Sequence, residues 1–242
     1  MTILTKIIVA TILSLTLFSC NFDIGYNHGV RGNGNVIEEN RPINSSFNEI
    51  IASEGLQVYL TQSDVVSITV EADENLQDLI ITEVIDNVLK IHTKQNIGKA
   101  SSKKVMVSFN NITKISSMSG SDVFSNNTIN AEHLELSTSS GSDMEILVNT
   151  KKLNCNSSSG SDLHITGETD RLIAEASSGS DIKAAKLNAK SSQVKASSGA
   201  GITVNTSEQL TAKASSGGDI KYYGNPARVE KSDNVSGSIQ KL

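Results

Sequence analysis

A short motif, Ser-Gly-Ser-Asp or a close variant, recurs six times in the second half of this 242-residue chain. The residue before the motif glycine is always serine, and the third residue after it is always apolar. The six glycines are Gly120, Gly141, Gly160, Gly179, Gly199 and Gly217. A repeat of about 19 residues constrains the fold strongly, because one such unit cannot bury an apolar face alone and has to stack on its neighbours.

Apolar and polar residues alternate on both sides of each motif glycine. Around Gly160, for example, Leu153 and Cys155 precede the turn and Leu163 and Ile165 follow it. A period of two indicates strand, turn, strand, whereas a helix needs a period near 3.6. Matching columns in successive units indicate parallel strands stacked in register, about 4.8 Å apart. We therefore predict an all-β fold: a parallel β-helix or β-solenoid with coils of about 19 residues, each made of two or three short strands.

The regular coils are predicted over residues 110–223, with the right-handed path that parallel crossovers adopt. Composition agrees with a narrow interior, since aromatic residues make up 4 % of the chain, Trp is absent, and serine occurs 36 times. Serine ladders in such a fold are expected to bond the turns rather than a ligand. The net charge of −5 argues against nucleic acid as a partner.

The N-terminus carries the pattern of an exported lipoprotein. Lys6 precedes an apolar run over residues 7–18, which is short for a membrane span and typical of a signal-peptide core. The run ends in Leu-Phe-Ser-Cys, which resembles a bacterial lipobox. This resemblance implies removal of residues 1–19 and lipidation of Cys20, which would anchor the protein in a membrane; the alternative is an ordinary signal peptide with an incidental cysteine. Residues 20–35 are rich in Gly and Asn and predict a flexible tether.

The first half of the mature chain is rich in strands but irregular. The predicted strands cover residues 47–52, 56–61, 66–72, 84–92 and 105–109. Gly55 follows Ile50 by five residues, the same spacing that precedes the motif glycines, so we expect an early coil here. Residues 73–78 are predicted to form a short helical turn and residues 96–104 a polar loop.

Several stretches together resemble one family. They are Arg41-Pro42-Ile43, Phe47-Asn48-Glu49-Ile50, Gly55-Leu56-Gln57-Val58, Ala72-Asp73-Glu74-Asn75-Leu76, the Ser-Gly-Ser-Asp coils and Tyr222-Tyr223-Gly224-Asn225-Pro226. The chain is similar over these motifs to the auto-transporter adhesin, head GIN domain family. The resemblance implies a β-helix-like domain over residues 36–242 in an envelope lipoprotein of Bacteroidetes-type bacteria, and it brings no catalytic residues.

An aspartate follows five of the six motif glycines by two residues, and Gly201 takes this place in the fifth repeat. This Asp column consists of Asp122, Asp143, Asp162, Asp181 and Asp219. Stacking would bring its carboxylates to about 5 Å, where like charges repel by about 1 kcal/mol per pair even in water. We expect hydrogen bonds with serine hydroxyls and turn N–H groups to hold the carboxylates. The alternative is a ladder of bound Ca²⁺.

The sequence contains no pattern that indicates catalysis. His28, His92, His133 and His164 share no metal-ligand spacing, and Cys155 falls in an inward column as a buried thiol. We therefore expect a non-enzymatic lipoprotein of the cell envelope, in the outer membrane on its periplasmic or surface face. It would act as an adhesin, a binding module or a structural module, with a cell-surface glycan or protein as ligand and no cofactor. A carbohydrate-active β-helix enzyme and a calcium-stabilised structural module are the alternatives.

Overall fold

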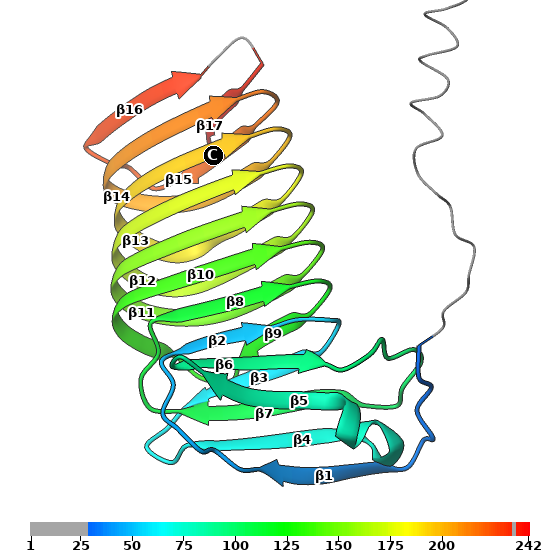
Figure 1. Ribbon diagram of the computed structural model, residues 1–242. Coiled ribbons are helices and arrows are strands. Elements are labelled where there is room, and N and C mark those ends of the chain that lie inside the picture. Colours follow the sequence, from blue (N-terminus) through cyan, green and yellow to red (C-terminus); the bar gives the residue numbers. More distant parts are fainter. Residues whose placement is uncertain (1–28, 234–235) are drawn as a thin grey trace, which may run out of the picture.

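The computed structural model describes residues 29–233 and 236–242. Within these residues one 3-10 helix and seventeen strands form a stack of coils on a broader base (Figure 1). The stack is a β-solenoid of about seven turns with a repeat of about 19 residues, and the predicted fold class is thus confirmed.

Ten strands build the solenoid above the base. They are β8 (Lys114–Met118), β9 (Asp122–Ser125), β10 (Ile129–Ser139), β11 (Asp143–Ser158), β12 (Asp162–Ser177), β13 (Asp181–Ser197), β14 (Gly201–Ser215), β15 (Asp219–Tyr223), β16 (Arg228–Asp233) and β17 (Ser238–Lys241). All of their pairings with one another are parallel, and β11 pairs with β12 in register from Asp143↔Asp162 to Ser158↔Ser177. Residues at equivalent positions of these two repeats therefore lie next to each other in adjacent coils.

A full coil contains one long strand rather than the two or three short strands that we predicted. The strands β11 to β14 have 15 to 17 residues each, and every one of them continues around the far side of the solenoid, opposite the motif corners. The pairing of β13 with β12 and with β14 shifts in register on that side. The motif corner is the only break in each of these coils. The far bend was missed because the strand continues through it and no regular glycine marks it.

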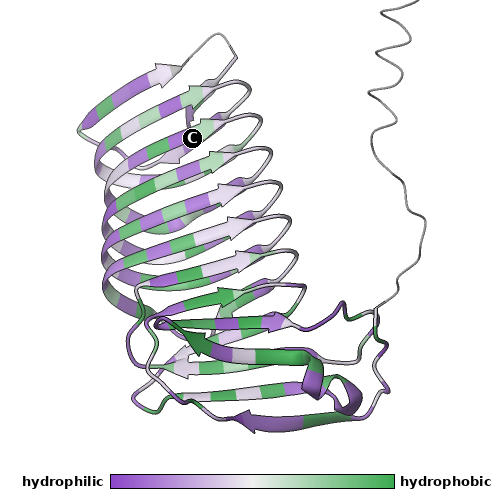
Figure 2. Ribbon diagram, viewed as in Figure 1, coloured by the Kyte–Doolittle hydropathy of each residue, from purple (hydrophilic) through white to green (hydrophobic). Residues whose placement is uncertain are grey.

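The interior of the solenoid is narrow and closed to solvent. Leu153, Cys155, Leu163 and Ile165 are at most 1 % exposed, as their columns predicted. Figure 2 shows hydrophobic and hydrophilic residues alternating along the strands. In the upper coils the inward positions hold many alanines, such as Ala174, because facing strands leave little room.

Seven strands and the helix form the base. They are β1 (Val36–Arg41), β2 (Glu49–Ala52), β3 (Gln57–Gln62), β4 (Ser67–Asp73), the helix η1 (Glu74–Leu79), β5 (Ile80–Ile85), β6 (Val88–Thr93) and β7 (Lys103–Phe109). β2 and β3 lie parallel to β8 and β9, with Ile50 opposite Ile115, which confirms the early coil around Gly55. Below them β6 and β7 form one further layer.

Antiparallel strands close the lower end of the stack. β4 pairs antiparallel with both β7 and β1, so the parallel edge of β7 is covered. The predicted strand over residues 84–92 is wrong: β5 and β6 form an antiparallel hairpin around Asp86 and Asn87, which both have a left-handed backbone. Asp and Asn favour such a two-residue turn, and this signal was overlooked within the apolar run.

Candidate functional site

The repeated motif forms a tight corner. At Ser159 and Gly160 φ is 59° and 68°, so both central residues of the turn are left-handed, a conformation that Gly adopts at little cost. The N–H of Gly160 donates a hydrogen bond of 3.1 Å to the carbonyl oxygen of Ser178 in the next coil, and equivalent bonds link the other corners. The motif glycine and the serine before it therefore have a structural role: they form the turn and link it to the next coil.

The serine after the glycine points into the solenoid. Ser180 is fully buried, and its Oγ lies 2.8 Å from the carbonyl oxygens of both Ser157 and Ser177, to which it can donate. The N–H of Ser177 donates back to the same Oγ at 3.2 Å. These contacts confirm that the serine ladder bonds the turns.

The Asp column lies outside the same corner. Its first four members are paired in register from coil to coil. Within the described residues, none of its carboxylates accepts a hydrogen bond from a serine hydroxyl or from a turn N–H, so the expected turn bonding is wrong. The reason is geometric, because the hydroxyls point inward and the corner N–H groups already donate to carbonyl oxygens of neighbouring coils.

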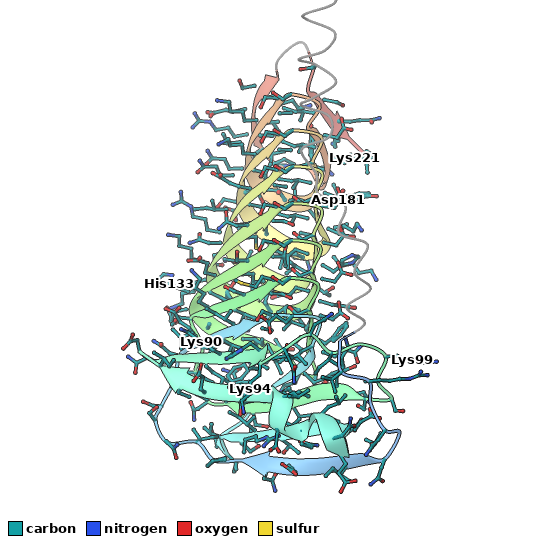
Figure 3. All side chains as sticks on the ribbon, turned by 45° about the vertical axis from the view of Figure 1, so that its right-hand side comes forward. Lys90, Lys94, Lys99, His133, Asp181 and Lys221 are labelled. Atoms are coloured by element: carbon teal, nitrogen blue, oxygen red, sulfur yellow. The ribbon has the colours of Figure 1, made fainter. Side chains whose placement is uncertain are left out.

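Lysine supplies part of the compensating charge. Lys183 Nζ donates to Oδ2 of Asp162 at 2.7 Å, and this bond, together with the charges of Asp162, Asp181 and Asp143, raises the pKa of Lys183. Asp122 lies farther from it, and burial and the charge of Asp143 raise the pKa of the Asp122 carboxyl. In Figure 3, Asp181 and Lys221 project from the same side of the stack.

Acidic and basic residues alternate from coil to coil at the far bend: Glu132, Lys151, Asp170 and Lys190 lie on successive strands and form a charge ladder. Lys151 Nζ lies 2.8 Å from Glu132 Oε2, and Lys190 Nζ lies 2.7 Å from Asp170 Oδ1. The hydrogen bond and charge of each acidic partner raise the pKa of the lysine. Such exposed ion pairs each stabilise a protein by about 1 kcal/mol or less, so this charge ladder is a feature of the coil surface rather than a reactive centre.

A hollow lies at one end of the base. Its volume is about 740 Å³. It is lined by residues of four loops and of adjoining strand ends: Ile43, Asn44, Ser45, Ser46, Phe47, Asn48, Val66, Asn87, Phe109, Asn110 and Asn111. No repeat marks these residues, so sequence reasoning missed the site; the only signal was the frequency of Asn in separate loops.

Comparison with known proteins identifies the family. Residues 46–226 match the family model described as "Putative auto-transporter adhesin, head GIN domain". The chain belongs to this family. The head GIN family has no known catalytic role, and its description implies a location at the cell surface or in the cell envelope.

Solved structures share the fold of this head GIN domain. The crystal structure of a putative adhesin from Bacteroides fragilis has a TM-score of 0.82 and 22 % identity, covering 88 % of this chain and 100 % of that chain. A putative lipid binding protein from Parabacteroides distasonis has a TM-score of 0.73 and 22 % identity, with 88 % and 99 % covered. A putative adhesin from Parabacteroides merdae has a TM-score of 0.70 and 16 % identity, with 88 % and 98 % covered. No curated protein matches the sequence.

The remaining predicted residues do not converge in the head GIN domain. Cys20 and His28 lie outside the described residues. His92 contacts Glu83 at 3.2 Å in the base, while His133 and His164 are exposed on the solenoid. Cys155 is a buried free thiol, as predicted, and burial raises its pKa. Residues 29–233 and 236–242 contain no group of three or more His, Cys, Asp or Glu that could hold a metal ion.

Part of the predicted tether is bound to the base. The carboxylate of Asp73, which is fully buried, accepts hydrogen bonds from the N–H groups of Gly34, Ser101 and Ser102. Gly32 N–H also donates to the carbonyl oxygen of Lys99. The prediction of a flexible tether is therefore wrong for residues 29–35, because a distant aspartate, not local composition, decides their conformation.

The described residues contain no helix long and apolar enough to cross a membrane.

Proposed function

We propose that this head GIN domain protein is a non-enzymatic adhesin of the cell envelope, anchored in the outer membrane by acyl chains on Cys20. The observation that carries the proposal is the match of residues 46–226 to an adhesin family. The apolar run and the lipobox-like residues before Cys20 support the anchor. Two or three acyl chains would hold the protein stably, since each buried methylene contributes about 0.8 kcal/mol.

The architecture suits a domain that is presented at a surface. The coils from β10 to β14 are joined by parallel strand pairing along most of each strand, which would make the solenoid stiff. The chain is held from Val30 onward by bonds to the loop before β7, so only about ten residues separate Cys20 from the base. At full extension they span at most about 35 Å. The base would therefore stay near the membrane.

The arrangement of charged groups gives no support to the carbohydrate-active enzyme. Such chemistry needs a proton-donating and a proton-accepting group on either side of one substrate. The hollow of the base is lined by no ionisable residue. On the described part of the solenoid, Lys183 is paired with Asp162 and Lys190 is paired with Asp170. A hollow of about 370 Å³ beside the second pair is lined by Glu168, Asp170 and Lys190, and there the lysine is already engaged with its acidic neighbour. The surface is suited to contact rather than to catalysis.

Attachment of cells tests the proposal. Cells that produce the protein, cells that lack it, and cells that produce the Cys20→Ala variant would be compared for retention on immobilised glycoproteins and polysaccharides. We expect retention above background only where the lipidated protein is present. Equal retention of all three strains would contradict the adhesin function.

A further inference from the structure

The hollow in the base is framed by loops that are fixed to one another. Asn48 N–H donates to the carbonyl oxygen of Asn87 at 3.0 Å, and Thr113 N–H donates to that of Asn48 at 2.8 Å. Ser63 N–H donates to the carbonyl oxygen of Phe109 at 2.8 Å. The loops after β1, β3, β5 and β7 thus form a connected rim, which would lose little conformational entropy when a ligand binds.

The polar side chains of the rim are free. The seven side chains are those of Asn44, Ser45, Ser46, Asn48, Asn87, Asn110 and Asn111, and all seven residues are exposed. Among the described residues, none of these side chains is hydrogen-bonded to another protein group; where Asn48 and Asn110 take part in hydrogen bonds with side chains, they do so through their backbone carbonyl oxygens. Other asparagines are engaged: Asn127 Nδ2 donates to the carbonyl oxygen of Gln62 at 2.9 Å, and Asn205 Nδ2 donates to Asn188 Oδ1 at 3.0 Å.

Apolar side chains form the rest of the lining. Ile43 and Phe47 are half-buried, Val66 is 43 % exposed, and Phe109 is 1 % exposed. The hollow therefore offers a small apolar surface surrounded by amides and hydroxyls, and its volume falls within the range of about 300–1,000 Å³ found for small-ligand sites.

We propose that this hollow binds an uncharged, hydroxyl-rich ligand, namely a segment of a neutral glycan. Each amide can both donate and accept, which matches a hydroxyl group that does the same. A sugar ring also has an apolar C–H face that can lie on Phe47. A charged ligand would leave its charge without a partner here, since no lining residue is ionisable. An acyl chain would need a long apolar cavity rather than a rim of amides.

The position of the hollow agrees with a role in contact. In Figure 1 the loops that follow β1, β5 and β7 lie at the left end of the base, whereas the segment before β1 enters at the right end. A ligand at the hollow would therefore approach from the side opposite the anchored chain. The inference rests on the proposed adhesin function and names the ligand class of that function.

Binding to an oligosaccharide array tests this inference on the purified protein. The array would carry neutral hexose and N-acetylhexosamine chains and the same chains with uronic acids or sulfates. We expect binding to at least one neutral chain, with a Kd below about 1 mM by calorimetry. The Asn44→Ala/Asn111→Ala variant should bind at least about tenfold more weakly, because two hydrogen bonds to the ligand are lost. The Asn156→Ala variant, which removes an exposed amide from the solenoid, should bind like the wild type.

Three results would overturn the inference: no binding to any neutral chain, preference for the charged chains, or equal affinity of the Asn44→Ala/Asn111→Ala variant. Displacement of a fluorescent fatty acid, with no glycan bound, would show a lipid site instead. The same variant in the cell-attachment assay separates the two proposals. Attachment that persists in the variant would refute the glycan site alone, whereas attachment absent in wild-type cells would refute the adhesin function.

Discussion

At the scale of single residues, Asp73 shows how one side chain fixes a segment that composition alone leaves undefined. It is fully buried and forms no ion pair with another described residue, a costly arrangement unless hydrogen bonds compensate for the lost water. Burial raises the pKa of this carboxyl, but the N–H groups of Ser102, Gly34 and Ser101 together outweigh burial, so the net pKa is lowered. The carboxylate thus joins the entering chain to the loop before β7.

The Asp73→Asn variant should be less stable by about 1.5–3 kcal/mol at pH 7, because a charged acceptor of several hydrogen bonds is lost. Since the folded pKa lies below the unfolded value of about 3.9, the wild-type advantage is present above that pH and is lost as the pH falls through the folded pKa. Urea unfolding between pH 2 and pH 7 would measure it. Asp64→Asn, at an exposed loop position, is the control. Equal stability of Asp73→Asn and wild type at neutral pH would show that the negative charge of Asp73 does not stabilise the fold.

Leu163 and His164 test the alternation of inward and outward side chains. Leu163 is fully buried and His164 is exposed, although they are adjacent. Leu163→Asp should cost several kcal/mol, because it places an unpaired charge in the interior. His164→Asp should change the melting temperature by only a few degrees at most. Comparable losses in the two variants would contradict the assigned orientation.

At the scale of the elements, the residues of the motif have different roles in the turn and in the strand that follows it. Serine and glycine build the turn, while the aspartates form a column of like charges beside it. Asp122 has the neighbouring carboxylate of Asp143, whereas Asp219 lies opposite Gly201 on one side and Ser238 on the other, and neither of these residues carries a carboxylate side chain. The two aspartates therefore differ in charge repulsion within one motif position.

Asp122→Asn should keep or raise stability at pH 7, by up to about 1 kcal/mol, because it removes this repulsion. The pKa of Asp122 is raised in the folded state, so its ionised form is unfavourable at neutral pH and the penalty disappears as the pH falls through the folded pKa. Any gain should thus vanish near pH 3. Asp219→Asn is the matched control and should be neutral. A clear loss of stability in Asp122→Asn alone would indicate a bound partner for that carboxylate.

The effect of calcium on the melting temperature distinguishes an Asp column that binds no ions from an Asp column that binds Ca²⁺. We expect the melting temperature to be the same with millimolar calcium and with chelator, because the column is interrupted at Gly201 and Lys183 already bonds Asp162. An increase of several degrees with calcium, lost in an Asp143→Asn/Asp162→Asn variant, would show that the calcium-stabilised module is the better description.

The sequence predicted the solenoid well where its signal was periodic. Leu153 and Leu172, for example, occupy the same column in successive repeats, and they lie opposite each other in the paired strands. The base has no such repeat. The antiparallel closure by β1 and β4 and the bonds of Asp73 to residues 34 and 101–102 join segments distant in the chain. The same reason hid the hollow, because its asparagines come from separate loops that only the fold brings together.

At the scale of the whole molecule, the domain has a stiff stack and a closed base that also receives the incoming chain. Cys20 precedes that point of attachment by only about ten residues. If Cys20 carries the anchor, Cys20→Ala should leave the protein soluble or with its signal peptide uncleaved. Fractionation and labelling with a radioactive fatty acid would measure this. Membrane association and acyl labelling that are both unchanged would contradict the lipid anchor.

Exposure on intact cells is the most direct test of the central claim that this is a surface adhesin. Lys213→Cys places a thiol on an exposed position of β14, while the native Cys155 is buried and the proposed acyl chain on the sulfur of Cys20 would block that thiol, so neither should react. A membrane-impermeant maleimide should label the Lys213→Cys protein on intact cells as fully as on permeabilised cells, and the wild-type protein only after denaturation. Labelling of Lys213→Cys that requires opening of the outer membrane would place the domain in the periplasm and contradict the account.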